Sequence, residues 1–107
     1  MGQDDSRRFP RIPSRNAVLV KETRDGDEAF VPTRTMSLGG CSFMSQEEIG
    51  SGEVLELLIS VDQRVISAPA RVVYSRLSDD SRYEVGVEFG DLAAEDREVL
   101  GGLLEVD

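Results

Sequence analysis

The sequence predicts an all-β fold, a barrel of short antiparallel strands, followed by one C-terminal helix. Two observations support this prediction. Short apolar runs alternate with turn residues at regular spacing as far as residue 89, and the apolar period becomes helical after residue 91. The chain has 107 residues, the size of a single domain. In a chain of this size, regularly spaced short strands favour a closed or nearly closed barrel.

Turn residues set the limits of the expected strands. The predicted strands are residues 16–21, 29–36, 41–44, 54–61, 64–76 and 82–89. Asp25-Gly26 is interpreted as a hairpin turn, because Asp-Gly suits the positive φ that hairpins require. Asp62-Gln63 is interpreted as a two-residue turn. Pro32 predicts an edge position or a bulge, since proline cannot donate to a ladder. Pro69 predicts a local disturbance of its long strand for the same reason.

The tail of the chain is expected to be a helix over residues 91–104. Its apolar residues recur at helical spacing and are Leu92, Val99, Leu100, Leu103 and Leu104. Asp91 is the predicted N-cap, because its side chain can accept from the first free amides of a helix. We expect Val99, Leu100 and Leu103 to pack on the strands.

Charge divides the chain into residues 1–15, a basic N-terminal arm, and residues 16–107, the barrel domain with its helix. The whole chain carries −9, but the arm is basic because four arginines face only two aspartates: Arg7, Arg8, Arg11, Arg15, Asp4 and Asp5. Guanidinium groups at short spacing, stiffened by Pro10 and Pro13, can present a bidentate anion site. The acidic body disfavours general binding of DNA or RNA.

Several classes of chemistry are disfavoured by composition. The chain has no histidine and one cysteine, so a zinc site or a serine–histidine–aspartate triad is not expected. We expect no metal, no catalytic residues and no enzyme, and we expect Cys41 to be a buried core residue. No apolar run approaches the roughly 20 residues of a membrane span, and the first residues lack the apolar segment of a signal peptide. A cytoplasmic location is therefore predicted.

Two short segments carry the functional signal. Arg7-Arg8-Phe9-Pro10-Arg11 precedes the first strand, and Thr35-Met36-Ser37-Leu38-Gly39-Gly40 ends the second. Together they resemble the paired signatures of the PilZ family, an Arg-x-x-x-Arg arm and an Asp/Asn-x-Ser-x-x-Gly motif on a six-stranded barrel. The order of later segments, residues 71–74, 83–89 and the helix, is also similar to this family. The resemblance covers about residues 7–104 and implies a non-enzymatic receptor for cyclic di-GMP that couples the messenger to a downstream protein partner.

The resemblance also assigns site residues. Arg7 and Arg11 match the arm arginines, which it implies grip a guanine edge and the phosphates. Bidentate arginine suits both groups. Arg8 is expected to contact phosphate or stack on a base. Ser37 matches the motif serine that hydrogen-bonds the ligand, and Gly40 matches the glycine that lets backbone and ligand approach closely.

Thr35 departs from the motif, because the family usually has Asp or Asn there. A carboxylate accepts from both N–H groups of a guanine edge, whereas one hydroxyl cannot span both. Losing a charge-assisted hydrogen bond costs on the order of 1.5–3 kcal/mol. Two interpretations follow: a receptor with weakened binding, or a PilZ-like adaptor that binds only protein. An RNA-binding barrel or an unrecognised enzyme is a third alternative.

Overall fold

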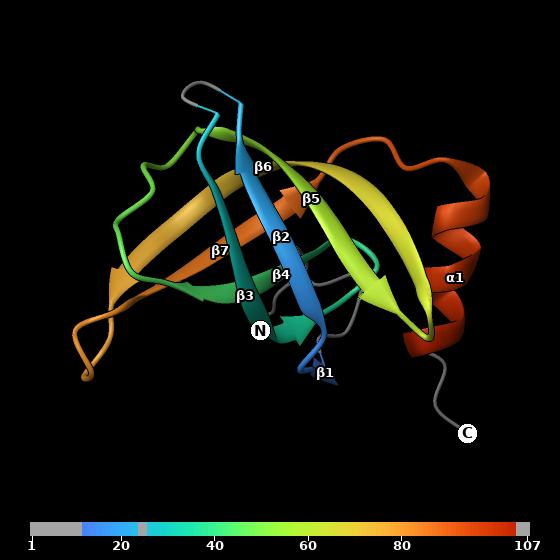
Figure 1. Cartoon of the computed structure of the whole chain (residues 1–107), viewed down its shortest axis with the longest axis horizontal. Coiled ribbons are helices and arrows are strands. Elements are labelled where there is room, and N and C mark those ends of the chain that lie inside the picture. Colours follow the sequence, from blue (N-terminus) through green and yellow to red (C-terminus); the bar gives the residue numbers. More distant parts are fainter. Residues whose placement is uncertain (1–11, 24–25, 105–107) are drawn as a thin grey trace, which may run out of the picture.

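Seven strands and one helix make up the described part of the chain (Figure 1). The computed structural model describes residues 12–23 and 26–104. The elements are β1 (Ile12–Pro13), β2 (Ala17–Glu22), β3 (Glu28–Met36), β4 (Gly40–Ser45), β5 (Val54–Val61), β6 (Arg64–Leu77), β7 (Tyr83–Phe89) and α1 (Ala94–Leu104).

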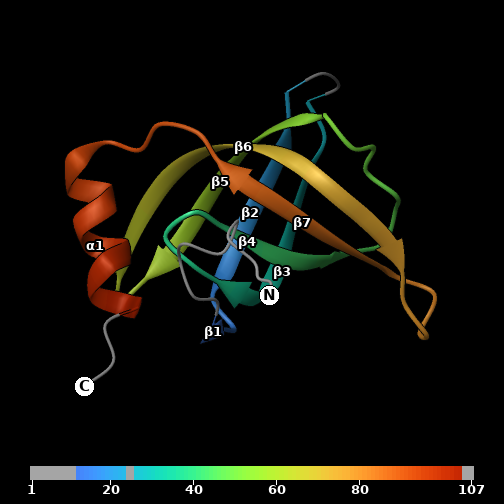
Figure 2. The same ribbon diagram turned by 180° about the vertical axis from the view of Figure 1, so that it is seen from behind.

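Six of the strands close into a barrel. Their order is β3-β2-β5-β6-β7-β4, and β4 pairs back to β3. Every pairing is antiparallel, and the two-residue β1 lies on β3 as an extra strand. Figures 1 and 2 show from opposite sides how the strands wrap around a common interior. The predicted six-stranded antiparallel barrel with a C-terminal helix is therefore confirmed.

Alternation along the strands produces the core. In β5 every second residue from Leu55 to Val61 is buried, and in β6 the same holds from Ile66 to Val72, as expected when one face of each strand points inward. The fully buried side chains include Phe43, Met36, Leu55, Leu57, Ile59, Ile66 and Leu100. Cys41 is buried in this core, as predicted.

The turn between β5 and β6 is the predicted two-residue turn. Asp62 has φ 48° and Gln63 has φ 69°, and Val61 pairs with Arg64 across the turn. Positive φ at both central residues belongs to the turn type that matches the twist of a hairpin.

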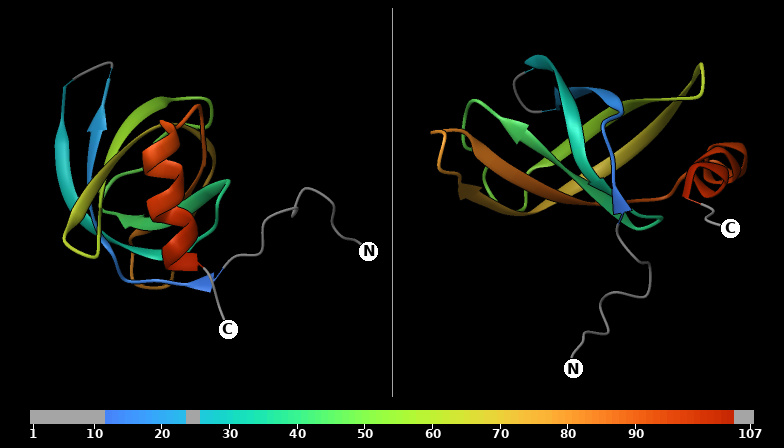
Figure 3. Two further views of the ribbon diagram at one scale, coloured as in Figure 1. Left: turned by 90° about the vertical axis from the view of Figure 1, so that its right-hand side faces the viewer. Right: turned by 90° about the horizontal axis from the view of Figure 1, so that it is seen from below.

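The helix α1 begins at Ala94, so the prediction of Asp91 as its N-cap was wrong. The amide of Arg97 donates to the carbonyl of Ala93 at 2.9 Å, which places the cap at Ala93. Leu100 is buried, and Val99 and Leu103 pack against the same core, which confirms the expected contact with the strands. Figure 3 shows the helix lying across one end of the barrel, beside β5 and β6.

The two strand prolines behave differently from each other. Pro32 lies in a stretch of β3 that pairs only with β2, next to a register shift between Thr33 and Thr35, so the predicted edge or bulge is confirmed. The disturbance expected at Pro69 was wrong. Pro69 pairs regularly with Glu56, and the irregularity of β6 falls between Val72 and Tyr74.

Candidate functional site

The turn from Ser37 to Gly40 joins β3 to β4 and carries half of the predicted motif. The amide of Ser37 donates to the carbonyl of Gly40 at 2.8 Å. The Oγ of Ser37 accepts from the amides of Gly39 and Gly40, both at 3.1 Å, and donates to the carbonyl of Gly40 at 3.3 Å. The serine is 4% exposed. In this structure Ser37 therefore shapes the turn, and a contact to ligand stays a prediction.

Gly40 is constrained by the sheet. A Cβ atom built on Gly40 would lie 2.1 Å from the carbonyl oxygen of Val87, a backbone atom of the neighbouring strand. A side chain there requires β4 and β7 to move apart. The close approach that the motif glycine permits in this structure is between two strands, and an approach by ligand remains untested.

Thr35 lies on the outer surface, opposite Ser42 of β4. Its Oγ1 is 2.8 Å from the Oγ of Ser42, and either hydroxyl can be the donor. Thr35 is half-buried, whereas Ser42 is 0% exposed. A buried hydroxyl without a hydrogen-bond partner is unfavourable, and Thr35 supplies that partner to Ser42. Sequence reasoning did not identify Ser42.

The strand β1 brings the end of the arm to this motif. Ile12 pairs with Met36, and Pro13 pairs with Thr35. The amide of Ser14 donates to the carbonyl of Arg34 at 2.9 Å. The last residues of the predicted arm are thus part of the sheet.

Hydroxyl groups anchor the junction between β1 and β2. The amide of Asn16 donates to the Oγ1 of Thr33 at 2.9 Å, and the hydroxyls of Ser14 and Thr33 also share a hydrogen bond. Thr33 is buried, so it fixes the position of the chain just after the arm. Sequence reasoning missed Ser14 and Thr33, because only the pairing of distant segments makes them neighbours.

The structure brings Thr35, Ser37 and Gly40 together in one hairpin. Arg7, Arg8 and Arg11 lie outside the described residues. Arg15, the last arginine of the arm, is exposed.

An outer row of residues crosses the sheet from Thr35. Thr35 pairs with Ser42, Ser42 with Gly86, and Gly86 with Tyr74. The ring of Tyr74 covers Gly86 so closely that a Cβ there would lie 2.1 Å from a ring carbon. The guanidinium of Arg76 lies 5.0 Å from the centre of the same ring, a cation–π distance. An aromatic and a cationic group thus lie on the outer surface that carries Thr35.

This region also contains a polar contact that fixes the tyrosine. The hydroxyl of Tyr74 donates to Glu84 at 3.2 Å, and Arg76 donates to the same carboxylate at 3.3 Å. The partners of Glu84 depend on the register shift in β6 between Val72 and Tyr74, which the sequence did not predict.

Metal-ligand clusters and membrane-spanning helices are both absent from the part of the chain that the structure describes. Within residues 12–23 and 26–104, no group of three or more His, Cys, Asp or Glu could hold a metal ion. In the same residues no helix is both long and apolar enough to cross a membrane.

Comparisons with solved structures agree on the fold. The inhibitor of motility MotI/DgrA of Bacillus subtilis is 21% identical, with a TM-score of 0.79 over 94% of this chain and 50% of that one. The K. pneumonia MrkH–c-di-GMP complex is 17% identical, with a TM-score of 0.77 over 97% of this chain and 52% of that one. The chain thus spans about half the length of these two proteins.

A smaller relative matches over most of its own length. The PilZ domain of YcgR from Escherichia coli, solved with c-di-GMP, is 14% identical, with a TM-score of 0.71 over 94% of this chain and 89% of that one. A search of curated proteins found no match. The sequence model of the PilZ domain matches residues 5–105, nearly the whole chain. The chain therefore belongs to the PilZ domain family.

Proposed function

We propose that this protein is a non-enzymatic receptor for cyclic di-GMP, in which the arm arginines and the Thr35–Gly40 hairpin close on the ligand from two sides. Arg7, Arg8 and Arg11 grip guanine and phosphate groups. Thr35, Ser37 and Gly40 form the opposing surface. On binding, the receptor signals to a downstream protein.

The observation that carries this proposal is the pairing of β1 with the end of β3. Ile12 pairs with Met36, the residue before Ser37. Arg11 is bonded to Ile12, and consecutive Cα atoms are about 3.8 Å apart. Arg7 is five residues from Ile12, so its Cα lies within roughly 17 Å of that residue. Covalent connection alone keeps these arginines within reach of the hairpin.

Two relatives give further support, since MrkH and the PilZ domain of YcgR have been solved with c-di-GMP. The charge distribution agrees with an anionic ligand at the arm. In a protein of net charge −9, clustered guanidinium groups offer a local site for phosphates.

The test is calorimetric titration of cyclic di-GMP into the wild-type chain and two matched variants. Arg11→Ala should weaken binding by about 2 kcal/mol, roughly thirtyfold, because a bidentate donor and a charge are both lost. Arg15→Ala removes the same charge from an exposed position and should change the dissociation constant less than about threefold. Equal losses in both variants would show that only net charge matters and would contradict the proposed site.

A second candidate function is an adaptor that binds protein but not cyclic di-GMP. The hydrogen bond between Thr35 and Ser42 favours it, because the single side-chain hydroxyl of Thr35 uses part of its hydrogen-bonding capacity within the protein and has less to offer a ligand. If the wild-type chain shows no heat of binding at high micromolar ligand, and Thr35→Asp restores none, the adaptor function is the better conclusion.

A further inference from the structure

The first half of β3 has one side without a neighbouring strand. Residues Glu28 to Pro32 pair with β2, but pairing with β4 begins only at Thr33, opposite Phe43. Among the residues that the structure describes, no other strand lies along this stretch. The closed barrel therefore retains a short open edge, a feature that can accept an added strand.

The backbone groups on this edge follow from the ladder with β2. The amide of Thr33 donates to Asn16, and the amide of Glu22 donates to Asp27, each at 2.9 Å. In an antiparallel ladder the bonded residues alternate, so odd-numbered residues of β3 bond to β2. Glu28, Phe30 and Pro32 consequently direct their backbone groups away from β2. The missing N–H of Pro32 falls on this open side and removes no bond from the ladder.

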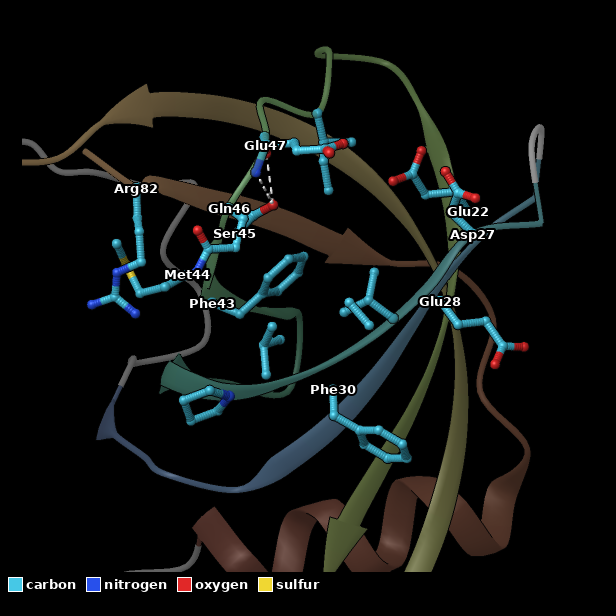
Figure 4. Close-up of a pocket in the computed structure, with 15 residues that line it drawn as sticks. Glu22, Asp27, Glu28, Phe30, Phe43, Met44, Ser45, Gln46, Glu47 and Arg82 are labelled. Atoms are coloured by element: carbon cyan, nitrogen blue, oxygen red, sulfur yellow. Dashed lines mark hydrogen bonds between the residues drawn. The ribbon is translucent and has the colours of Figure 1, made fainter. Parts of the chain in front are cut away.

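A groove of about 430 Å³ runs beside this edge (Figure 4). Apolar side chains of Val31, Phe43 and Ile49 line it, and Phe30 on its border is 79% exposed. None of Thr35, Ser37 or Gly40 lines the groove, so it is separate from the proposed ligand site.

The groove has an acidic end. Glu22, Asp27 and Glu28 gather there in Figure 4. Glu28 has a cationic neighbour, Lys21, at 3.8 Å, but both side chains are well exposed, so this contact is weak. Arg82 lies at the far end of the groove, where it donates to Asp80 at 2.6 Å.

We propose that this groove is the docking site for an extended segment of a partner protein, which adds to β3 as an extra strand along Glu28 to Pro32. Backbone hydrogen bonds to Glu28 and Phe30 would supply the register. Apolar side chains of the segment would face the groove, beside Ala29 and Val31. Alternate basic side chains would face outward, beside Glu28. The inference rests on the proposed function in one respect, because it takes the bound segment to belong to the downstream partner of the receptor.

The negative charge of the protein and the end of β3 at which the chain enters the sheet favour this partner over other occupants of the groove. A second copy of the chain, paired antiparallel about Phe30, would place Glu28 of each copy opposite Pro32 of the other. It would supply no basic side chain beside Glu28, and the two molecules would each carry −9. The chain itself enters the sheet at the opposite end of β3, because Ile12 pairs with Met36. A basic extended segment offers backbone partners to this edge and cationic side chains to the exposed Glu28.

The test uses the full chain without cyclic di-GMP and a synthetic probe, the capped peptide Lys-Val-Lys-Val-Lys-Val. Titration followed by NMR should shift the amides of Glu28 and Phe30 and of the facing residues of β4. A peptide with Glu in place of Lys should bind at least about tenfold more weakly. A peptide N-methylated at alternate residues, which cannot pair as a strand, should lose binding to the same extent.

Protein variants make the test specific. Phe30→Pro removes an N–H that faces the groove and leaves the ladder to β2 intact, so it should weaken the Lys peptide at least about tenfold. Glu28→Lys should weaken the Lys peptide and strengthen the Glu peptide, a reversal that misfolding cannot produce. Leu77→Ala, at a residue that is 65% exposed on β6, is the matched control and should change neither affinity.

Three results would overturn the inference. The first is absence of shifts at peptide concentrations up to about 1 mM. The second is equal affinity for the Lys and Glu peptides. The third is formation of a dimer by the protein alone that Phe30→Pro abolishes, because that result would assign the open edge to a second copy of the chain. Because cyclic di-GMP is absent throughout, failure here is distinguishable from failure of the proposed receptor function.

Discussion

Replacing Thr35 with aspartate should convert the proposed site toward the usual family motif and tighten cyclic di-GMP binding. Asp has nearly the size of Thr, so one carboxylate oxygen can take the position of Oγ1, which now lies 2.8 Å from the Oγ of Ser42. The hydroxyl of Ser42 then donates to that oxygen. The second oxygen is left for the N–H groups of a guanine edge.

The magnitude is set by the new hydrogen bond to the ligand and by the further desolvation of the carboxylate when the ligand covers it. A charge-assisted hydrogen bond contributes about 1.5–3 kcal/mol. Residue 35 is half-buried, so the ligand removes the remaining water from the carboxylate, and this offsets part of the gain. Ser42 reduces that cost because it is 0% exposed and supplies a donor. We therefore expect a gain near the lower limit, about tenfold in the dissociation constant.

The assay is calorimetric titration of wild type, Thr35→Asp and the double variant Thr35→Asp with Ser42→Ala. The double variant should lose part of the gain, because the carboxylate then lacks its internal donor. Thr35→Val separates stability from affinity, since it leaves the hydroxyl of Ser42 without its partner and should lower the free energy of unfolding by about 1–3 kcal/mol. A folded Thr35→Asp protein that binds no more tightly than wild type would refute this reasoning.

Three further predictions concern the fold. Gly40→Ala should lower the free energy of unfolding by about 1–3 kcal/mol, because the new methyl group meets the carbonyl of Val87. Gly101→Ala in α1 meets no atom within 4 Å and should raise the free energy of unfolding by about 0.5–1 kcal/mol. Chemical denaturation measures both values, and an unchanged stability of Gly40→Ala would contradict the close approach of β4 and β7. Leu100→Ala should lower the free energy of unfolding by about 2–5 kcal/mol. The control Val65→Ala, at a position that is 64% exposed, should lower it by less than about 0.5 kcal/mol. Similar melting temperatures for the two variants would show that the helix does not pack on the barrel. Hydrogen bonds from Arg82 lower the pKa of Asp80 below its ordinary value of 3.8. The contact between Arg82 and Asp80 should therefore persist at neutral pH and be lost only as the pH falls through that lowered pKa. NMR of the Asp80 carboxyl group should report the midpoint of its titration, and a midpoint at or above the ordinary value would contradict the contact.

Local patterns were sufficient for the barrel strands. The strand Val54–Val61 and the turn after it agree with the prediction, because alternation and turn chemistry act over neighbouring residues. The start of the helix was misplaced, since Asp91 and the acidic pair at Glu95 and Asp96 both resemble N-terminal signals.

Features that depend on distant segments were beyond local reasoning. Pro69 was expected to disturb β6, but its carbonyl accepts from Gly90 at 2.7 Å just beyond the last residue pair with β7. Its missing N–H therefore costs little. The motif residues Thr35, Ser37 and Gly40 could be named from the sequence. The contact of Thr35 with Ser42 and the contact between Ser14 and Thr33 could not, because both arise from strand pairing between separate segments.

Chemical labelling of Cys41 can report how often strand β4 separates from its neighbours. It is the only cysteine of the chain, it is 0% exposed, and it follows Gly40 directly. A thiol reagent in solution can reach its sulfur only when β4 separates from its neighbours, so the labelling rate measures that opening. Cyclic di-GMP, if it clamps this hairpin, should slow labelling by the factor one plus the ratio of free ligand to its dissociation constant. A single chemical modification would thus measure barrel stability and ligand affinity in the same unaltered molecule.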